Sequence, residues 1–134
     1  MNIIKFKGTN LFIVNQIQYL FDQHQFELNN LNTVFFEYDI VEKNNNLIIK
    51  SDIYKSTYVC PVNFKNIFTD IHNHLNAFKF DIYKIHYFPF SSYLEIEKKN
   101  VKLNYIHNMI LAILVFNPDG FKKENLYQKI WPKD

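Results

Sequence analysis

The chain has little or none of several residue types on which common structures and activities depend. It has one cysteine, Cys60, so it can form no intrachain disulfide, and a reducing compartment is expected. Its two glycines, Gly8 and Gly120, are too few for a glycine-rich loop that cradles phosphate. Apolar runs are shorter than the roughly 20 residues that span a bilayer, and Lys5 and Lys7 interrupt the region where a signal peptide would lie. We therefore expect a cytoplasmic protein without a membrane partner.

Arginine is absent, and all 15 basic residues are lysines. Lysine binds phosphate as a mobile point charge, whereas arginine supplies the bidentate fork that suits guanine edges. Any contact of this chain with nucleic acid is therefore expected to depend on the backbone, on Asn or Gln, and on DNA shape.

Material for a packed core is abundant. Hydrophobic residues make up 48% of the 134 residues, charged residues make up 21%, and the aromatic side chains comprise 14 Phe, 9 Tyr and 1 Trp. This composition excludes a disordered chain. The length fits one domain, or two very small ones that share a core.

Charge is unevenly distributed along the chain, although the net charge is only +2. Residues 8–42 contain five acids and no lysine, which gives −5, and residues 98–134 contain seven lysines and three acids, which gives +4. An acidic N-terminal part and a basic C-terminal part fit a DNA-facing module attached to another module. Ordinary solvated faces would give the same pattern.

The first 80 residues alternate between strand and helix patterns. The apolar run at 11–14 predicts a strand, and the polar run at 27–32 predicts a loop. A helix is expected from Asn15, with apolar positions at Ile17, Leu20, Phe21 and His24. Residues 33–40 and 47–53 predict two strands joined by the turn Asn44-Asn45-Asn46.

The clearest helix is predicted after Cys60-Pro61, because a proline near a helix start costs no hydrogen bond. Its apolar stripe comprises Phe64, Ile67, Phe68, Ile71, Leu75 and Phe78.

Residues 81–103 alternate and contain Pro89 and Ser91-Ser92, which predicts three or four short strands in a small antiparallel sheet. Asn104 is a plausible N-cap for the next helix. The inward face of that helix would be Ile106, Met109, Ile110 and Ile113. The turn signal at 117–120 precedes a second short helix at 121–131. We therefore predict an α+β fold with a receiver-like or α/β part at 1–80 and a second domain at 81–134.

The segment from Tyr83 resembles the winged-helix output domain of OmpR/PhoB-type response regulators. That family begins with a small antiparallel sheet, a "Leu-Thr" step and a helix, then a turn, a helix ending in an aromatic, a recognition helix and a wing. Here YLEIEKKNVKLN matches the final strands and the step, with Leu103-Asn104 in place of Leu-Thr. MILAILVFNPDGFKKENLYQKIWP matches the first two helices and their turn. The resemblance covers about 50 residues and implies an incomplete winged helix that lacks the recognition helix and the wing.

The resemblance also implies where DNA would be contacted. The second helix of the family abuts the DNA backbone, so the expected phosphate contacts are Lys122, Lys123, Lys129 and Lys133. Such contacts position a protein on double-stranded DNA without specifying sequence.

The N-terminal part more faintly resembles the receiver domain of the same regulators. LFIVNQIQYLFDQHQF matches a receiver's first strand and helix, and YVCPVNFKNIFTDIHNHL matches its last strand and helix. Asn15-Gln16 stand where active receivers have a magnesium-binding acidic pair, and Cys60 replaces the lysine before the proline. Only Asp39 could be a phosphoacceptor. The resemblance implies a shortened, non-phosphorylated remnant that dimerises.

No other motif predicts chemistry. His72 and His74 lie two apart on a predicted helix, hence on opposed faces, and the remaining histidines are scattered: His24, His86 and His107. We expect no metal and no cofactor, and we expect Cys60 to be an inert thiol. The aromatic run Phe35, Phe36 and Tyr38 is assigned to packing rather than to base stacking, because acidic neighbours would repel phosphate.

Two hypotheses follow, and an enzyme ranks third because no constellation of acid, base and nucleophile is apparent. The first is a DNA-binding, transcription-regulator-like protein of winged-helix type with weak, backbone-mediated affinity. The second is a protein-interaction module that does not bind DNA and pairs with itself or with a related regulator. Its docking patch would be the apolar underside of the helices at 105–116 and 121–131.

Overall fold

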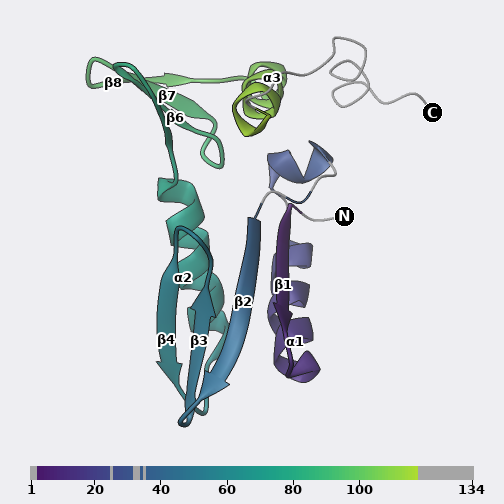
Figure 1. The fold of residues 1–134 in the computed structure, drawn as a ribbon. Helices are drawn as coiled ribbons and strands as arrows, with labels where there is room; N and C mark the ends of the chain where they lie inside the picture. The colour runs from purple at the N-terminus through teal and green to yellow at the C-terminus, as the bar shows by residue number, and fades with distance from the viewer. Residues whose placement is uncertain (1–2, 25, 32–33, 35, 118–134) are drawn as a thin grey trace, which may run out of the picture. The chain divides into compact units, whose positions relative to one another are not determined.

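The structure is a computed structural model that describes residues 3–24, 26–31, 34 and 36–117, and it confirms the predicted α+β class (Figure 1). The chain divides into two compact units. The first unit comprises Met1–Gln25 and Thr33–His74, and the second comprises Phe26–Asn32 and Leu75–Asp134. Each unit contains one four-stranded sheet. No described helix is long and apolar enough to cross a membrane.

The first unit is a mixed sheet with two helices. Its elements are β1 (Ile4–Gly8), α1 (Leu11–Gln23), β2 (Phe36–Lys43), β3 (Asn46–Lys50), β4 (Lys55–Val59) and α2 (Phe64–Ala77), of which the last turn belongs to the second unit. The strand order is β1-β2-β3-β4, with β1 and β2 parallel and the other pairs antiparallel. Parallel neighbours need a crossover, and α1 lies in it. Both helices lie behind the sheet in Figure 1.

The core of the first unit forms between the sheet and the helices. Alternate strand residues are buried, because side chains alternate between the two faces of a strand. The ring centroids of Phe6 and Phe21 lie 5.2 Å apart, and those of Phe21 and Phe68 lie 4.7 Å apart. These contacts join β1 to α1 and α1 to α2. The other face of the sheet carries mostly charged side chains, together with apolar ones such as the exposed Val41 and Val59.

The strand predicted at 11–14 is wrong, since these residues form the first turn of α1. The Asn10 side chain accepts a hydrogen bond from the Ile13 N–H at 3.3 Å and so caps the helix. Leu11 and Phe12 are each 67% exposed, so this apolar run is not a buried strand. The first strand is β1 instead. The helix predicted from Asn15 is confirmed, although it begins four residues earlier.

Other elements of the first unit were predicted in part from local signals. The strand predicted at 47–53 is β3, which ends at Lys50, and β4 was not among the strands predicted from the residue pattern. The hairpin is confirmed: Asn44 and Asn45 have positive φ, and Lys43 pairs with Asn46 across a two-residue turn. The helix after Pro61 is also confirmed. It begins at Phe64, because the Asn63 side chain accepts from the Lys65 N–H at 2.9 Å. Within its predicted stripe, the residues at full burial are Ile67, Ile71 and Leu75.

The second unit is an antiparallel meander with a short and a long helix. Its elements are η1 (Glu27–Leu31), β5 (Phe80–Ile82), β6 (Ile85–Phe88), β7 (Tyr93–Ile96), β8 (Lys99–Lys102) and α3 (Tyr105–Phe116). Consecutive strands pair in the order β5-β6-β7-β8, which confirms the predicted small sheet. The loop predicted at 27–32 is wrong. Leu28 and Leu31, three residues apart, are buried by one 3₁₀ turn.

The helix after the meander is confirmed, and Asn104 caps it by accepting from the His107 N–H at 2.8 Å. Met109 and Ile113 are buried as predicted, whereas Ile106 and Ile110 are only half-buried. The fully buried side chains also include Asn108 and Ala112, which the apolar pattern did not indicate. Only the first residue of the predicted turn at 117–120 is described. The rest of the turn and the predicted helix at 121–131 lie outside the described residues.

Candidate functional site

The predicted phosphate contacts lie outside the described residues: Lys122, Lys123, Lys129 and Lys133. The described lysines nearest to them in the sequence are exposed at the β7–β8 hairpin: Lys98, Lys99 and Lys102. This hairpin directly precedes α3, so the basic character of the C-terminal part begins within the described structure. The predicted DNA contacts themselves stay a prediction.

The open face of the first sheet carries a row of charges in strand register. Lys7 on β1 lies beside Asp39 on β2, Asp39 pairs with Lys50 on β3, and Lys50 pairs with Lys55 on β4. Lys50 and Lys55 are therefore directly opposite each other, which is unfavourable for like charges.

Lys7 carries the ion pairs of this row. Its Nζ atom lies 3.2 Å from Glu37 Oε2 and 3.7 Å from Asp39 Oδ1. The hydrogen bond to Glu37 and the charge of Asp39 raise the pKa of Lys7. All three side chains are about half exposed, so the pairs are surface pairs that contribute little stability. The acids nonetheless offset part of the positive charge of this face.

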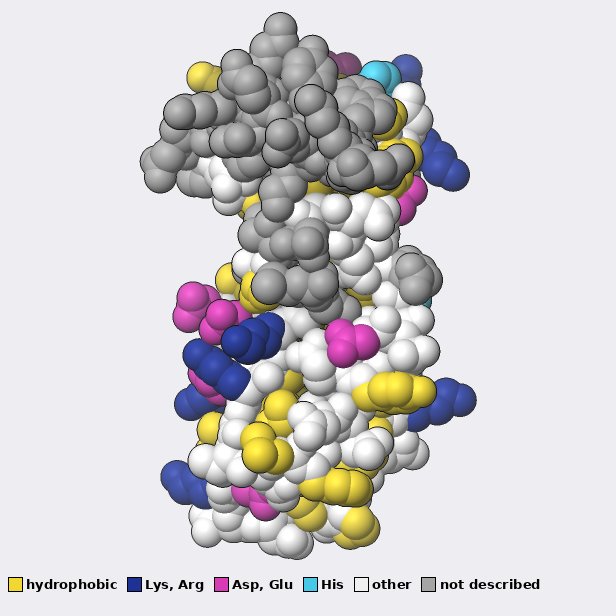
Figure 2. Space-filling view, turned by 90° about the vertical axis from the view of Figure 1, so that its right-hand side faces the viewer, with side chains coloured by type: hydrophobic (Ala, Val, Ile, Leu, Met, Phe, Trp, Pro, Cys, Tyr) yellow, Lys and Arg dark blue, Asp and Glu magenta, His cyan; other side chains and the backbone are white. Residues whose placement is uncertain are grey.

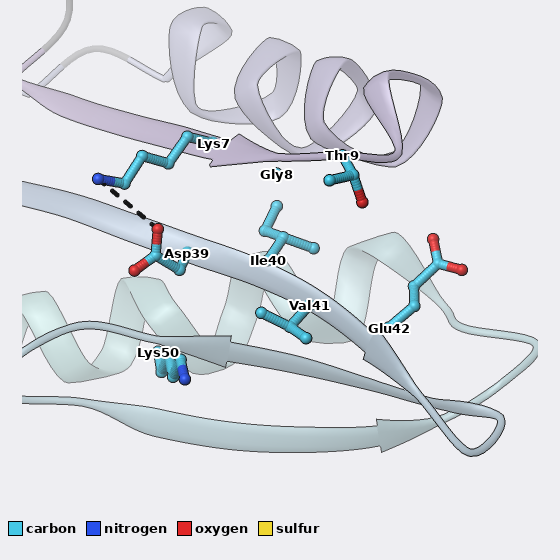
Figure 3. Close-up of a pocket in the computed structure, with 8 residues that line it drawn as sticks. All are labelled: Lys7, Gly8, Thr9, Asp39, Ile40, Val41, Glu42 and Lys50. Carbon is cyan, nitrogen blue, oxygen red and sulfur yellow. Dashed lines mark ion pairs between the residues drawn. The ribbon is translucent and has the colours of Figure 1, made fainter.

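A shallow depression of about 360 Å³ lies on this face (Figure 3). It is lined by Lys7, Gly8, Thr9, Asp39, Ile40, Val41, Glu42 and Lys50. Figure 3 shows Lys7 reaching toward Asp39, with the helices behind the sheet. At Gly8, a Cβ atom would lie 2.5 Å from the Ile40 carbonyl oxygen, so only glycine permits this approach of β1 to β2. With two lysines and two acids, the depression has no single charge preference.

The receiver-like positions do not form a site. Asn15 and Gln16 were assigned to the end of a first strand. This assignment was wrong, because residues 11–14 are helical and both side chains lie within α1. Asp39 lies in the middle of β2 beside Lys7, not at a strand end. Cys60 is half-buried, and its N–H donates to the Asn45 carbonyl at 2.9 Å.

The second sheet carries a polar row that the sequence did not reveal. Asp81, His86 and Glu95 are neighbours in register on β5, β6 and β7. Asp81 Oδ1 and His86 Nδ1 lie 2.5 Å apart, and this hydrogen bond, with the charge of Lys79, lowers the pKa of Asp81. The pair is exposed at the carboxylate, so it is suited to pairing with solvent or a ligand rather than to buried chemistry.

A buried polar network connects η1, β6 and α3 in the second unit. Tyr87 Oη donates to Asn108 Oδ1 at 2.6 Å, and Asn108 Nδ2 donates to the Pro89 carbonyl at 3.2 Å and to Glu27 Oε2 at 3.4 Å. The Ser92 hydroxyl donates to the same Glu27 oxygen at 2.9 Å. Burial raises the pKa of Tyr87, and the Glu27 charge adds to this. The network joins the three elements through the Asn108 side chain.

The histidines of α2 point in different directions, as predicted from their spacing. His74 packs on the Tyr54 ring with centroids 4.6 Å apart, and His72 meets His24, with the two Nε2 atoms 3.2 Å apart. Burial lowers the pKa of both His72 and His74, and the neighbouring His24 adds to the effect at His72. The meeting of His24 and His72 was not predicted, because 48 residues separate them.

The aromatic residues of β2 belong to the core. The sequence had predicted packing rather than base stacking for them, because acidic neighbours would repel phosphate. Phe36 is 7% exposed and Tyr38 is fully buried, so neither can stack on a base, while Phe35 lies outside the described residues. Among the described residues, no group of three or more His, Cys, Asp and Glu side chains could hold a metal ion. No protein-family model, no curated protein and no solved structure matches the chain.

Proposed function

We propose that this protein is a DNA-associated, regulator-like protein without enzymatic activity, whose second unit is built like the opening of a winged-helix domain. The observation that carries the proposal is the order of elements: four antiparallel strands, a Leu103-Asn104 step and an N-capped helix. This is the order with which the OmpR/PhoB output domain begins. The lone cysteine fits action in a reducing compartment such as the cytoplasm.

Affinity for DNA would come from lysine–phosphate attraction. The basic segment from Lys98 onward supplies seven lysines against three acids, and it includes the exposed β7–β8 hairpin. The open face of the first unit is a weaker candidate, because Glu37 and Asp39 lie among its lysines. We therefore assign phosphate contact to the C-terminal lysines rather than to the first sheet.

The test is the salt dependence of binding to random-sequence duplex DNA, measured by fluorescence anisotropy. We expect about micromolar affinity at low salt, and a slope of the logarithm of the association constant against log salt of about −0.9 for each phosphate contacted. The variant Lys122→Gln/Lys123→Gln should make this slope less steep, because fewer phosphates are contacted. The matched control Lys50→Gln/Lys55→Gln removes the same charge from the first sheet and should leave the slope unchanged.

Three outcomes of this titration are informative. A less steep slope in the first variant alone supports the proposal. An equal loss in both variants would mean that only net charge matters, and the C-terminal assignment would then be wrong. Absence of binding at low salt would overturn DNA association for this chain.

A second candidate function, a protein-interaction module, is favoured by the outer face of α1. Phe12 is 67% exposed and Tyr19 is 60% exposed, on the side of the helix opposite to its buried residues, and Leu11, 67% exposed, lies at the flank of that side. Figure 2 views the molecule from the side on which α1 lies in Figure 1, and hydrophobic side chains are visible there, with Lys, Asp and Glu side chains beside and between them. Grouped apolar exposure of this kind marks interaction surfaces.

Self-association can be measured by sedimentation velocity over a range of concentrations. If α1 mediates pairing, Phe12→Ser/Tyr19→Ser should yield a monomer, while Val59→Ser, which alters an equally exposed apolar residue on β4, should not. A wild-type chain that stays monomeric at all concentrations would remove self-pairing as the function of this face.

A further inference from the structure

His24 and His72 come together from the two helices that cover the first sheet. His24 is the C-cap of α1, and its N–H donates to the Phe21 carbonyl at 3.2 Å. His72 lies in the third turn of α2. Their ring centroids are 4.7 Å apart, and the two Nε2 atoms are 3.2 Å apart.

This nitrogen separation matches two ligands of one transition metal ion. Zinc–imidazole bonds of 2.0–2.1 Å in a tetrahedral site place two ligand nitrogens about 3.3 Å apart. A direct hydrogen bond between the rings is the competing interpretation, and it requires a proton on one Nε2 atom. Metal binding requires both Nε2 atoms to be unprotonated, so the two states exclude each other.

The ring positions are fixed by an aromatic contact within the core. The Phe68 ring stacks on His72 with centroids 5.6 Å apart and an interplanar angle of 24°, and it meets the edge of His24 at 5.6 Å. Phe68 in turn packs on the fully buried Phe21. Ligands held in this way lose little conformational freedom when an ion binds.

We propose that the first unit binds one late first-row divalent ion, such as Zn²⁺, Ni²⁺ or Co²⁺, through the Nε2 atoms of His24 and His72. Imidazole suits these ions and does not suit Mg²⁺. Within the described ranges no group of three or more such side chains occurs, so the described protein ligands of the proposed ion are these two imidazoles. Both histidines are half-buried, which leaves the site accessible. The bound ion links the end of α1 to α2.

The first test is thermal unfolding of the full chain with each ion, in a Cys60→Ser background that removes the thiol as a ligand. We expect the Tm to rise with Zn²⁺, Ni²⁺ and Co²⁺ and to stay unchanged with Mg²⁺, because an ion that binds only the folded state stabilises it. His24→Gln and His72→Gln should each weaken binding at least tenfold. His107→Gln, which removes an exposed histidine of α3, should bind as the parent does.

A second measurement does not depend on how well the variants fold. In the parent protein, Zn²⁺ should shift the imidazole NMR signals of His24 and His72 and leave those of His86 and His107 in place. Unchanged signals and an unchanged Tm at saturating metal would overturn the proposal. So would a shift confined to His86, which would place the ion at the Asp81–His86 pair.

Discussion

The two units each enclose a fully buried tyrosine, but the two hydroxyl groups have opposite surroundings. In the first unit, Tyr38 packs on Phe6 with ring centroids 5.3 Å apart, and its hydroxyl has no hydrogen-bond partner in the part of the chain that the structure describes. In the second unit, the Tyr87 hydroxyl donates to Asn108. Among the described residues, the buried tyrosine hydroxyl is therefore part of a hydrogen-bonded network in the second unit but not in the first.

The two sheets also differ in how far apart in the sequence their paired strands lie. The first contains a parallel pair whose partners, such as Phe6 and Tyr38, are 32 residues apart in the sequence. The second is a meander in which each strand pairs with the next one along the chain. Contacts between large rings nonetheless occur in the second unit as well. Phe80 contacts Phe78 and Phe116, and the Phe88 and Tyr93 rings stack with centroids 4.4 Å apart.

The largest expected effect comes from Asn108→Ala, which removes the centre of the network in the second unit. The Tyr87 hydroxyl and the Pro89 carbonyl would each lose a buried partner, and a small cavity would remain, so we expect a loss of about 3 kcal/mol in the free energy of unfolding. Urea denaturation measures it. Asn100→Ala, at an exposed site on β8, is the control and should change little.

In the first unit, Gly8→Ala should be the most disruptive small change. The added Cβ meets the Ile40 carbonyl oxygen at 2.5 Å, so β1 and β2 must separate locally, at a cost of about 2 kcal/mol. Hydrogen exchange should accelerate first in β1 and β2. Thr9→Ala, at the next and exposed residue, serves as the matched control. An unchanged midpoint in urea would mean that the strands are not as closely apposed as described.

A pair of Tyr→Phe substitutions tests the comparison directly. Tyr87→Phe should cost about 1.5 kcal/mol, because it leaves the buried Asn108 Oδ1 atom without the donor that it has in the wild type. Tyr38→Phe should be neutral or slightly stabilising, within about 0.5 kcal/mol, because the hydroxyl that it removes has no hydrogen-bond partner among the described residues. Equal losses for the two variants would show that the units do not differ in this way.

The smallest effect concerns acid stability. The hydrogen bond from His86 lowers the pKa of Asp81 in the folded state, so its contribution is present above the unfolded pKa and is lost as pH falls through the folded value. The stability difference between the wild type and Asp81→Asn should therefore be constant near neutral pH and shrink below about pH 4. In His86→Gln, the NMR titration midpoint of the Asp81 carboxyl should rise. If the midpoint does not move, His86 does not lower the pKa of Asp81, and the prediction is wrong.

The sequence predicted the features that depend on near neighbours. The hairpin at Asn44-Asn45, the Asn104 cap and the buried stripe of α2 all follow from signals within a few residues. The run at 11–14 was assigned to a strand because a short apolar run does not separate strand from helix. Only the Asn10 cap favoured the helix, and that signal was available in the sequence.

The candidate sites depend on distant residues, and this is why sequence analysis missed them. His24 and His72 meet across 48 residues, and the contact of Asn108 with Glu27 spans 81. Periodicity treats a buried asparagine as an interruption of an apolar face. In the structure, Asn108 is a requirement of that face, because Tyr87 and Pro89 present groups that need a partner.

The short segment Glu27–Leu31 has a consequence for how this protein can be taken apart or recombined. It belongs to the second unit, although the residues on both sides of it belong to the first. A fragment cut at residue 80 would thus leave Leu28, Leu31 and the Glu27 carboxylate behind. Each unit comprises two separate segments of the sequence, so neither can be transferred to another protein as one contiguous stretch. The two units are therefore expected to be inherited, expressed and engineered together.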